Sequence, residues 1–379
     1  MANTVPFSEQ YKQRLSGFVR MSKKAGSRSD YVQGGGGNTS CKVDDSLMAI
    51  KASGYRLDQI DMDQAYAVLD YQALRQFYQQ TDPAGLADIE QAGSAQAKTA
   101  TLTVEGLPAL RPSVEAGFHS LLDTYVLHTH AIYANLVTCS AEGREVAASA
   151  LADQGVGHAF VPYINPGAQL TFALLEAIED KKKETGEKPG ILFMQNHGFI
   201  VTGDDADGCL LLHDQVNEKL AAAYGVSAAD WPKIAVRPAA DPADGQTFIS
   251  DTAWLRDRLL DQAWDLDFFT EQALYPDQLV FLGGKLGVAE GTLAEVRENG
   301  AAGLNSLKDT CTIFRRTGEV FYRCGKNEAQ TIEETLCAIL FITRTIRQAS
   351  RTICTMSEAG RQFISNWESE QYRKTITAR

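Results

Sequence analysis

Tyr125-Val-Leu-His-Thr-His130 is a short apolar segment that predicts a buried β-strand ending in two histidines. Side chains at positions i and i+2 of a strand point to the same face of a sheet, so His128 and His130 are expected to lie side by side. Imidazole is the commonest protein ligand of zinc and similar ions. The H-x-H motif therefore indicates either part of a metal site or two histidines packed at the edge of a core.

A third histidine supports the metal interpretation. His197 stands between Asn196 and Gly198, at a sharp corner that follows the apolar run 191–195. Catalytic zinc usually has three protein ligands and one open position, which makes His197 the natural third ligand. The other histidines are interpreted as structural or supporting groups: His119, His158 and His213.

Glu115 is the candidate acid/base group. It lies near the start of a helix predicted over residues 113–123, with Ser113 as its cap, and this helix leads into the H-x-H strand. A carboxylate at a helix N-terminus often only complements the helix dipole. Beside a metal ion, a carboxylate serves as a ligand, a base or both. The residues alone leave both interpretations open.

A glycine-rich loop, GGGGNTS at residues 34–40, is a candidate anion site. It is not a P-loop, because no Gly-Lys-Ser/Thr follows. It is either a flexible turn or a cradle in which backbone N–H groups and Asn38 bind an anion. Two further polar loops are candidates for the same anion site: Lys51-Ala-Ser53-Gly54 and Arg111-Pro-Ser113. Three such loops predict that one end of the ligand is a phosphate or a carboxylate.

The composition narrows the class of protein. The 379 residues carry a net charge of −12, which argues against nucleic acid and anionic membranes as partners because both need basic surface. No apolar run reaches the roughly 18 residues of a membrane span, and the first residues do not form a signal peptide pattern. The seven scattered cysteines are typical of reduced residues in a cytoplasmic protein.

The length predicts two domains. Residues 226–247 are rich in Ala, Pro, Asp and Gly and are interpreted as a linker, so one domain is expected at 1–240 and a second at 241–379. Strands and helices mix without regular βαβ alternation, which favours an α/β layered core with a mainly antiparallel sheet. The second domain is expected as a C-terminal α+β extension without its own catalytic residues, serving in packing, in oligomer contacts or as a lid.

The periodicity of apolar residues predicts the individual elements. In the first domain, helices are expected at 8–25 (with Ser8 as cap), 62–80, 113–123, 131–138, 143–153, 167–180 and 204–224. Strands are expected at 46–52, 125–129, 191–195 and 199–202, and residues 81–108 as a polar surface excursion. In the second domain, helices are expected at 251–262, 327–349 and 357–374, with a strand at 278–282 and a hairpin turning at 317–318.

The ordered motifs GGGGNTS, KASGY, RPSVE, HTH and QNHGFIVTG resemble the class II aldolase/adducin family over roughly residues 10–225. The KxSG and PSxE motifs and the tail NWESEQYRK are most similar to the aldolase half of rhamnulose-1-phosphate aldolase/dehydrogenase-type proteins. The resemblance implies a central, mainly antiparallel sheet flanked by helices and a ring-shaped homotetramer. It also implies a metal-dependent carbon–carbon lyase that cleaves a ketose 1-phosphate or related sugar acid through an enediolate.

The resemblance assigns roles position by position. His128, His130 and His197 match the metal ligands, with Zn²⁺ favoured and Mn²⁺, Fe²⁺ or Co²⁺ as alternatives. Glu115 matches the acid/base glutamate. Tyr163, in VPYINPG, resembles a tyrosine that reaches the site of a neighbouring subunit and serves the aldehyde end. The substrate-binding loops are matched by Gly37, Asn38, Lys51, Ser53, Gly54 and Ser113.

Two features depart from the family pattern and keep alternatives open. Val114 stands where simpler members have a second serine before the glutamate, so a carboxylate or an unphosphorylated substrate is an alternative to a phosphate. The segment between His130 and Tyr163 is longer than in small members. The competing functions are a sugar-phosphate epimerase or a decarboxylase of the same superfamily and, in a different class, a non-catalytic adducin-like binding module. Family epimerases tend to carry aspartate at the position of Glu115, which favours the aldolase.

Overall fold

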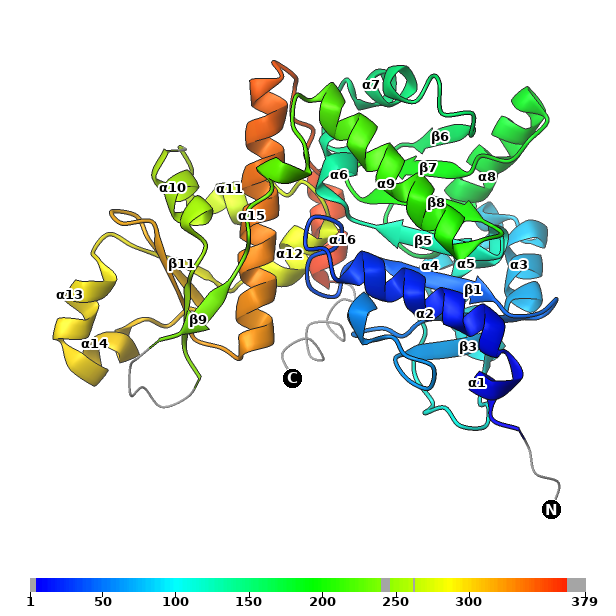
Figure 1. Cartoon of the computed structure of the whole chain (residues 1–379), viewed down its shortest axis with the longest axis horizontal. Helices are drawn as coiled ribbons and strands as arrows, with labels where there is room; N and C mark the ends of the chain where they lie inside the picture. Colours follow the sequence, from blue (N-terminus) through cyan, green and yellow to red (C-terminus); the bar gives the residue numbers. More distant parts are fainter. Residues whose placement is uncertain (1–4, 240–245, 262, 367–379) are drawn as a thin grey trace.

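Two β-sheets, one large and one small, form the scaffold of the computed structural model, which describes residues 5–239, 246–261 and 263–366. They lie side by side, with the long helix α15 (Lys326–Gln348) between them (Figure 1). α15 packs on α6 (Ile132–Thr138) beside the large sheet and on β9 and β10 of the small one. None of the described helices is long and apolar enough to cross a lipid bilayer.

The large sheet has eight strands in the order β4-β3-β2-β1-β5-β8-β7-β6. Neighbouring strands are antiparallel except β6 and β7, which are parallel. The predicted α/β core with a mainly antiparallel sheet is therefore confirmed. The strands are β1 (Asn38–Lys42), β2 (Leu47–Lys51), β3 (Tyr66–Asp70), β4 (Thr101–Leu102), β5 (Tyr125–Thr129), β6 (His158–Val161), β7 (Ile191–Met194) and β8 (Gly198–Gly203).

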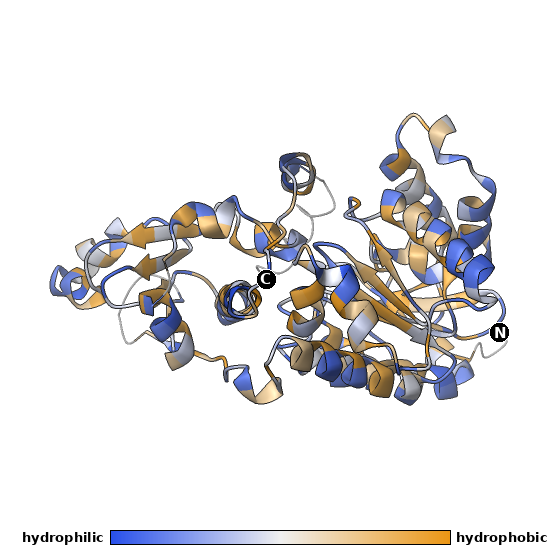
Figure 2. Cartoon of the chain, turned by 90° about the horizontal axis from the view of Figure 1, so that it is seen from above, coloured by the Kyte–Doolittle hydropathy of each residue, from blue (hydrophilic) through white to orange (hydrophobic). Residues whose placement is uncertain are grey.

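Helices cover both faces of this sheet because its strands bury side chains on both. In β2, Met48 and Ile50 belong to one hydrophobic cluster and Ala49 to another, as the period of two requires. Figure 2 shows hydrophobic residues along the strands and hydrophilic residues on the outer helix surfaces. One face carries α2 (Lys12–Gly26), α6 and α9 (Ala206–Ala223), and the other carries α3 (Tyr71–Gln80), α4 (Ile89–Ala100), α5 (Ala116–Leu121) and α8 (Ala168–Thr185).

The small sheet belongs to the C-terminal region, and its order is β11-β12-β13-β10-β9. β12 and β13 form the predicted hairpin, and β11 and β12 are parallel. Its strands are β9 (Val236–Pro238), β10 (Phe248–Ser250), β11 (Leu286–Ala289), β12 (Cys311–Phe314) and β13 (Glu319–Tyr322). Its helices are α10 (Ala253–Asp261), α11 (Leu266–Thr270), α12 (Pro276–Leu282), α13 (Leu293–Glu298), α14 (Gly300–Ser306), α15 and α16 (Glu358–Asn366).

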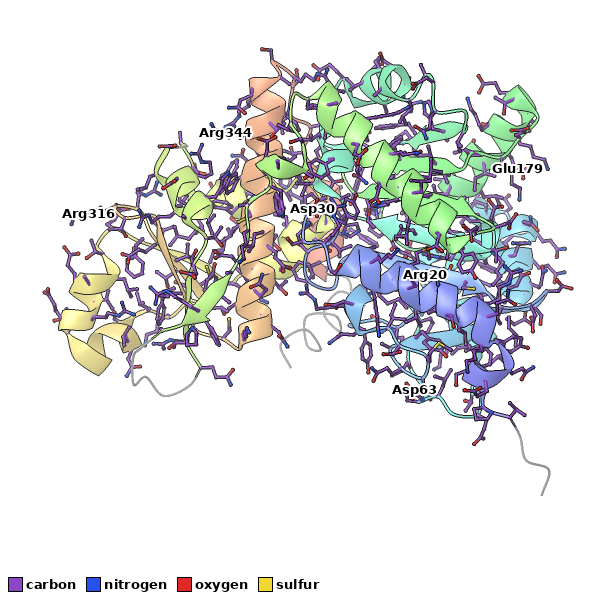
Figure 3. All side chains as sticks on the ribbon, in the orientation of Figure 1. Arg20, Asp30, Asp63, Glu179, Arg316 and Arg344 are labelled. Atoms are coloured by element: carbon purple, nitrogen blue, oxygen red, sulfur yellow. The ribbon has the colours of Figure 1, made fainter. Side chains whose placement is uncertain are left out.

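Figure 3 shows Arg20 on helix α2. Arg20 on α2 pairs with Asp207 on α9 at 2.8 Å, and both side chains are exposed. Exposed pairs of this kind stabilise a protein by about 0–1 kcal/mol. The packing of α2 on α9 is therefore due mainly to apolar burial, with Leu15, Phe18 and Val216 fully buried.

The helix expected at 62–80 is wrong in its first half. Residues 66–70 form strand β3, and α3 begins only at Tyr71. Asp70 marks the boundary, since its side chain accepts a hydrogen bond from the backbone N–H of Ala73 at 3.0 Å and caps α3. β3 lies inside the sheet and buries both faces, so it reads as a continuous apolar run without a period of two.

The strand expected at 278–282 is also wrong, because these residues belong to helix α12. Every residue of α12 is buried, so its sequence carries no amphipathic period. Pro276 in the first turn is the helix signal that remains.

Other expected elements need smaller corrections. The predicted surface excursion 81–108 contains α4 and β4, and the predicted linker 226–247 contains β9. The helix expected at 8–25 is interrupted at Tyr11, and no side chain caps the short α1 (Phe7–Gln10) that precedes it. The helix expected at 357–374 is described as α16, and its remainder, with most of NWESEQYRK, lies outside the described residues.

Candidate metal centre

Three buried histidines converge where strand β5 ends and strand β8 begins. His128 is the penultimate residue of β5, His130 follows that strand, and His197 occupies the corner before β8. The ring centroids lie 5.0–5.1 Å apart, and one ligand nitrogen from each ring falls within 4.8 Å of the others. Within the described chain, this is the group of histidine, cysteine or carboxylate side chains placed to hold a metal ion.

The β5–β8 register brings His197 to the H-x-H motif. Thr129 pairs with Phe199 across these antiparallel strands. Asn196 turns the corner with a positive φ of 51°, and its side-chain amide donates to Leu274 O at 2.9 Å and Cys354 O at 2.7 Å. Gly198 is required because a Cβ there would lie 2.4 Å from Thr129 O.

Hydrogen bonds fix which ring nitrogens face the centre. Nδ1 of His128 lies 2.9 Å from Phe199 O, and Nδ1 of His130 lies 2.5 Å from Asp277 Oδ2. Both partners are acceptors, so Nδ1 carries the proton in both rings and both Nε2 atoms present lone pairs. These two Nε2 atoms lie 3.2 Å apart. Two nitrogen lone pairs that face each other at this distance repel each other, and a cation bound between them would remove the repulsion.

Glu115 lies beside the rings of His128 and His197, at the N-cap of α5 and not inside a helix capped by Ser113 as expected. Its Oε1 is 3.2 Å from His197 Nε2, and its Oε2 is 3.5 Å from His128 Nε2. Burial raises the pKa of Glu115, but the neighbouring histidines outweigh burial and hold that pKa well below its usual range. Burial lowers the pKa of His128 to about 3. The centre therefore combines the neutral imidazole of His128 with one carboxylate.

Glu115 Oε1 is buried, and its contact within the described residues is with His197 Nε2 at 3.2 Å, outside good hydrogen-bond geometry. A buried polar atom without a well-aligned partner costs about 1–3 kcal/mol, so such an atom points to a missing ligand. Together with the paired Nε2 atoms, it fits a divalent metal ion. Three imidazoles and an open side match the ligand set of catalytic zinc.

A polar network behind the centre orients Glu115. The amide nitrogen of Asn38 donates to Glu115 Oε2 at 2.5 Å and to Ser113 Oγ at 3.0 Å. Asn38 Oδ1 accepts a hydrogen bond from His119 Nε2, and His119 Nδ1 lies 2.7 Å from Ser40 Oγ. His119 is fully buried, so it supports the site and does not line it. His213 similarly contacts Thr129 Oγ1, at 2.8 Å, on the other side of β5.

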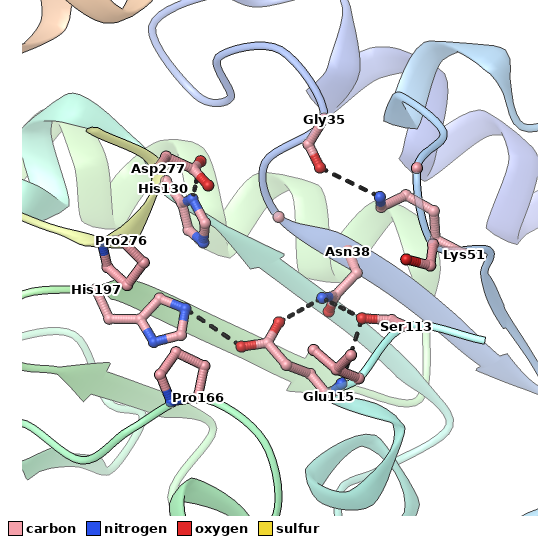
Figure 4. A pocket seen from close by; sticks show the side chains of 14 residues that line it. Gly35, Asn38, Lys51, Ser113, Glu115, His130, Pro166, His197, Pro276 and Asp277 are labelled. Atoms are coloured by element: carbon pink, nitrogen blue, oxygen red, sulfur yellow. Dashed lines mark hydrogen bonds and ion pairs between the residues drawn. The ribbon is translucent and has the colours of Figure 1, made fainter. Parts of the chain in front are cut away.

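The centre opens into a cavity that brings the three predicted anion loops together (Figure 4). Lys51 Nζ donates to Tyr55 O at 2.7 Å and to Gly35 O at 3.3 Å, which holds its ammonium group between two loops. Gly37 has a φ of 63°, and a Cβ there would lie 2.6 Å from His128 O. The lining residues are Gly35, Gly37, Asn38, Lys51, Ser53, Gly54, Ser113, Val114, Glu115, His130, Pro166, His197, Pro276 and Asp277.

Tyr163 does not line this cavity. Its ring packs against Gly360 of α16, where an added Cβ would lie 2.7 Å from the tyrosine ring, and its hydroxyl lies 3.4 Å from Asn165 Oδ1. The same loop reaches the cavity through Pro166. Within one chain, Tyr163 is therefore separate from the other predicted site residues.

Pro276 and Asp277 line the cavity, although sequence reasoning did not select them. Both belong to the first turn of α12 in the C-terminal region. The segment was expected to form a strand, and a lone Asp after Tyr-Pro carries no metal-site signal. Proline at the start of a helix was the only indication of a helix terminus there.

Comparison with known proteins identifies the family. The family model described as Class II Aldolase and Adducin N-terminal domain matches residues 17–224. This match covers more than half of the chain, which therefore belongs to the class II aldolase and adducin family. No curated protein matches the chain.

Several solved structures are similar to part of this chain at low identity. The N-terminal class II aldolase domain of a conserved protein from Thermoplasma acidophilum is 21% identical, with a TM-score of 0.45, over 58% of this chain and 95% of that one. YgbL from Klebsiella pneumoniae, a putative aldolase/epimerase/decarboxylase, is 18% identical with a TM-score of 0.38 over 55% and 87%. An L-fuculose 1-phosphate aldolase is 18% identical with a TM-score of 0.36 over 55% and 83%.

Proposed function

We propose that this protein is a metal-dependent carbon–carbon lyase that reversibly cleaves a ketose 1-phosphate or a related sugar acid into two small carbonyl fragments. The observation that carries the proposal is the position of the ionised Glu115, 3.2–3.5 Å from two of three converging histidines. Family membership supports the same reaction class. Glu115 in place of an aspartate favours the lyase over an epimerase.

His128, His130 and His197 would hold a divalent ion, with Zn²⁺ favoured by three imidazoles and Mn²⁺, Fe²⁺ or Co²⁺ as alternatives. Such an ion acts as a Lewis acid that stabilises negative charge on a substrate carbonyl oxygen. The chain supplies the rest of the site, because the three rings leave one side open and their burial keeps water away.

Glu115 is proposed as the acid/base residue. Asn38 holds Oε2, whereas Oε1 faces the metal centre, 3.2 Å from His197 Nε2. Oε1 is therefore the atom proposed to exchange a proton with the substrate carbon next to the carbonyl. General acid–base catalysis of this kind contributes about 10²–10⁴-fold to a rate.

The anion loops are proposed to bind the other end of the substrate. The cavity near Lys51 is lined by Gly37, Asn38, Ser53, Gly54 and Ser113, which offer backbone and side-chain donors. A phosphate or a carboxylate fits these donors and this cation. Val114 leaves the choice between the two open.

The last part of the proposal concerns the role of Tyr163 and the oligomeric state of the protein. Because Tyr163 lies away from the cavity of its own chain, we propose that it serves the aldehyde end in the site of a neighbouring subunit of a homotetramer. The seven cysteines are all free, which is compatible with a reducing, cytoplasmic location.

The test is a product screen with the purified protein, stripped of metal and then supplied separately with Zn²⁺, Mn²⁺, Fe²⁺ or Co²⁺. Ketose 1-phosphates and 2-keto sugar acids serve as substrates, and NMR identifies the products. Two carbonyl fragments support the lyase. A stereoisomer of the substrate would make the protein an epimerase, and release of carbon dioxide a decarboxylase. Failure to bind any of these ions would favour an adducin-like binding module.

A further inference from the structure

A carboxylate from the C-terminal region reaches the metal centre. Asp277, on α12, is fully buried, and its Oδ2 lies 2.5 Å from Nδ1 of His130 (Figure 4). Removing a carboxylate from water costs several kcal/mol unless hydrogen bonds or charges compensate. The hydrogen bond with His130 thus offsets part of the cost of burying the Asp277 carboxylate.

The segment that carries Asp277 is itself fixed in place. Gln278 Oε1 accepts a hydrogen bond from Leu274 N at 2.8 Å, and its amide donates to Phe269 O at 2.9 Å. Leu274 O in turn accepts from Asn196 Nδ2, next to His197. The segment therefore connects the His130 ring with the corner that carries His197.

The glycine loop has space for this carboxylate only because it lacks side chains. A Cβ on Gly36 would lie 2.3 Å from Asp277 Oδ2 and 3.0 Å from His130 Nδ1. The Asp277 carboxylate is thus closely packed between the glycine loop and the His130 imidazole.

We propose that Asp277 is a positioning residue that fixes the tautomer and the ring orientation of His130, so that the C-terminal region is an integral part of the metal centre. The inference rests on the proposed function, because it presupposes that the histidines bind metal. A carboxylate on Nδ1–H keeps the proton off Nε2 and keeps the Nε2 lone pair directed at the centre. Carboxylates in this position raise metal affinity about 10–100-fold.

The test compares metal affinities of full-length variants. Asp277→Asn keeps the shape of the side chain but removes its charge, and Asp277→Ala removes the hydrogen bond as well. Glu333→Gln is the matched control, because Glu333 is a buried carboxyl group of the C-terminal region that does not line the cavity. The dissociation constant for Zn²⁺ is measured by competition with a chromophoric chelator, and the visible spectrum of the Co²⁺-loaded protein reports ligand geometry. Thermal unfolding of the metal-free variants checks their folding.

The expected result is a 10–100-fold weaker Zn²⁺ affinity and an altered Co²⁺ spectrum for Asp277→Asn, a larger loss for Asp277→Ala, and wild-type values for Glu333→Gln. An Asp277→Asn affinity within twofold of the wild type would overturn the inference and leave the metal centre intact. An equal loss in Glu333→Gln would also overturn it, because it would indicate general loosening of the region. A wild-type protein that binds no ion would refute the proposed function itself.

Discussion

Glu333 makes a quantitative prediction about stability. It lies on α15, fully buried against the small sheet, where Oε1 accepts from Ser250 Oγ at 2.6 Å and Oε2 contacts the Tyr322 hydroxyl. Burial raises the pKa of Glu333 from 4.5 to about 7, although these hydrogen bonds oppose the rise. The carboxyl is therefore protonated in the folded protein at pH values where it ionises in the unfolded chain.

Proton linkage gives the direction in which the free energy of unfolding changes with pH. Below about pH 4.5 the group is neutral in both states, and above about pH 7 it is ionised in both. Between these values only the unfolded chain releases the proton, so the free energy of unfolding falls by about 1.4 kcal/mol for each pH unit. The contribution of Glu333 to stability is thus lost as pH rises, by about 3 kcal/mol in total.

Glu333→Gln removes this dependence while keeping a hydrogen-bonding side chain of the same shape. Urea unfolding, followed by the fluorescence of Trp254 and Trp264 in the same region, is measured from pH 4.5 to 8. The variant should gain stability relative to the wild type as pH rises, by about 3 kcal/mol across the window. A difference between the two proteins that stays constant with pH would refute the reasoning.

Three further predictions concern the site. Glu115→Gln should retain bound metal but lose about 10²–10⁴-fold in turnover, measured by metal analysis and by NMR of deuterium exchange; full activity would rule out the acid/base role. Glu334→Gln should raise KM for an anionic substrate about tenfold without changing metal affinity. The reason is that Glu334 Oε2 accepts a hydrogen bond from Gly34 N at 3.0 Å and lies 3.6 Å from Arg56, so it holds the glycine loop in place. Steady-state kinetics in which kcat falls and KM does not change would contradict this prediction. Gly198→Ala should lower the free energy of unfolding by about 1–3 kcal/mol, because its Cβ would lie 2.4 Å from Thr129 O; an unchanged melting curve would show that the corner adapts.

Sequence reasoning selected the three histidines that converge in the structure, because their signals are local or carried by motifs. His128 and His130 share a face through the period of a strand. The convergence of His197 depends on the β5–β8 register, which pairs Thr129 with Phe199 and which no local pattern specifies. The family resemblance supplied that long-range information for His197 and Glu115.

The parts that sequence reasoning missed depend on contacts between distant segments. Asp277 meets His130 only after α12 packs against α15 and α16. Local periodicity also failed to predict two buried elements, β3 and α12. Both have largely apolar sequences without a clear period, so packing against neighbouring elements determines whether each forms a strand or a helix. The position of Tyr163 relative to another subunit remains a prediction, because it depends on an assembly.

Solvent exchange tests the central claim most directly. The metal-loaded protein is incubated in D₂O with small carbonyl compounds that correspond to the nucleophilic fragment, such as dihydroxyacetone phosphate or pyruvate, and NMR follows the C–H signal next to the carbonyl. A metal-bound centre with Glu115 as base predicts stereospecific loss of that signal with one of these compounds, abolished by metal removal and by Glu115→Gln. Exchange that persists without metal, or no exchange with metal bound, would contradict the account.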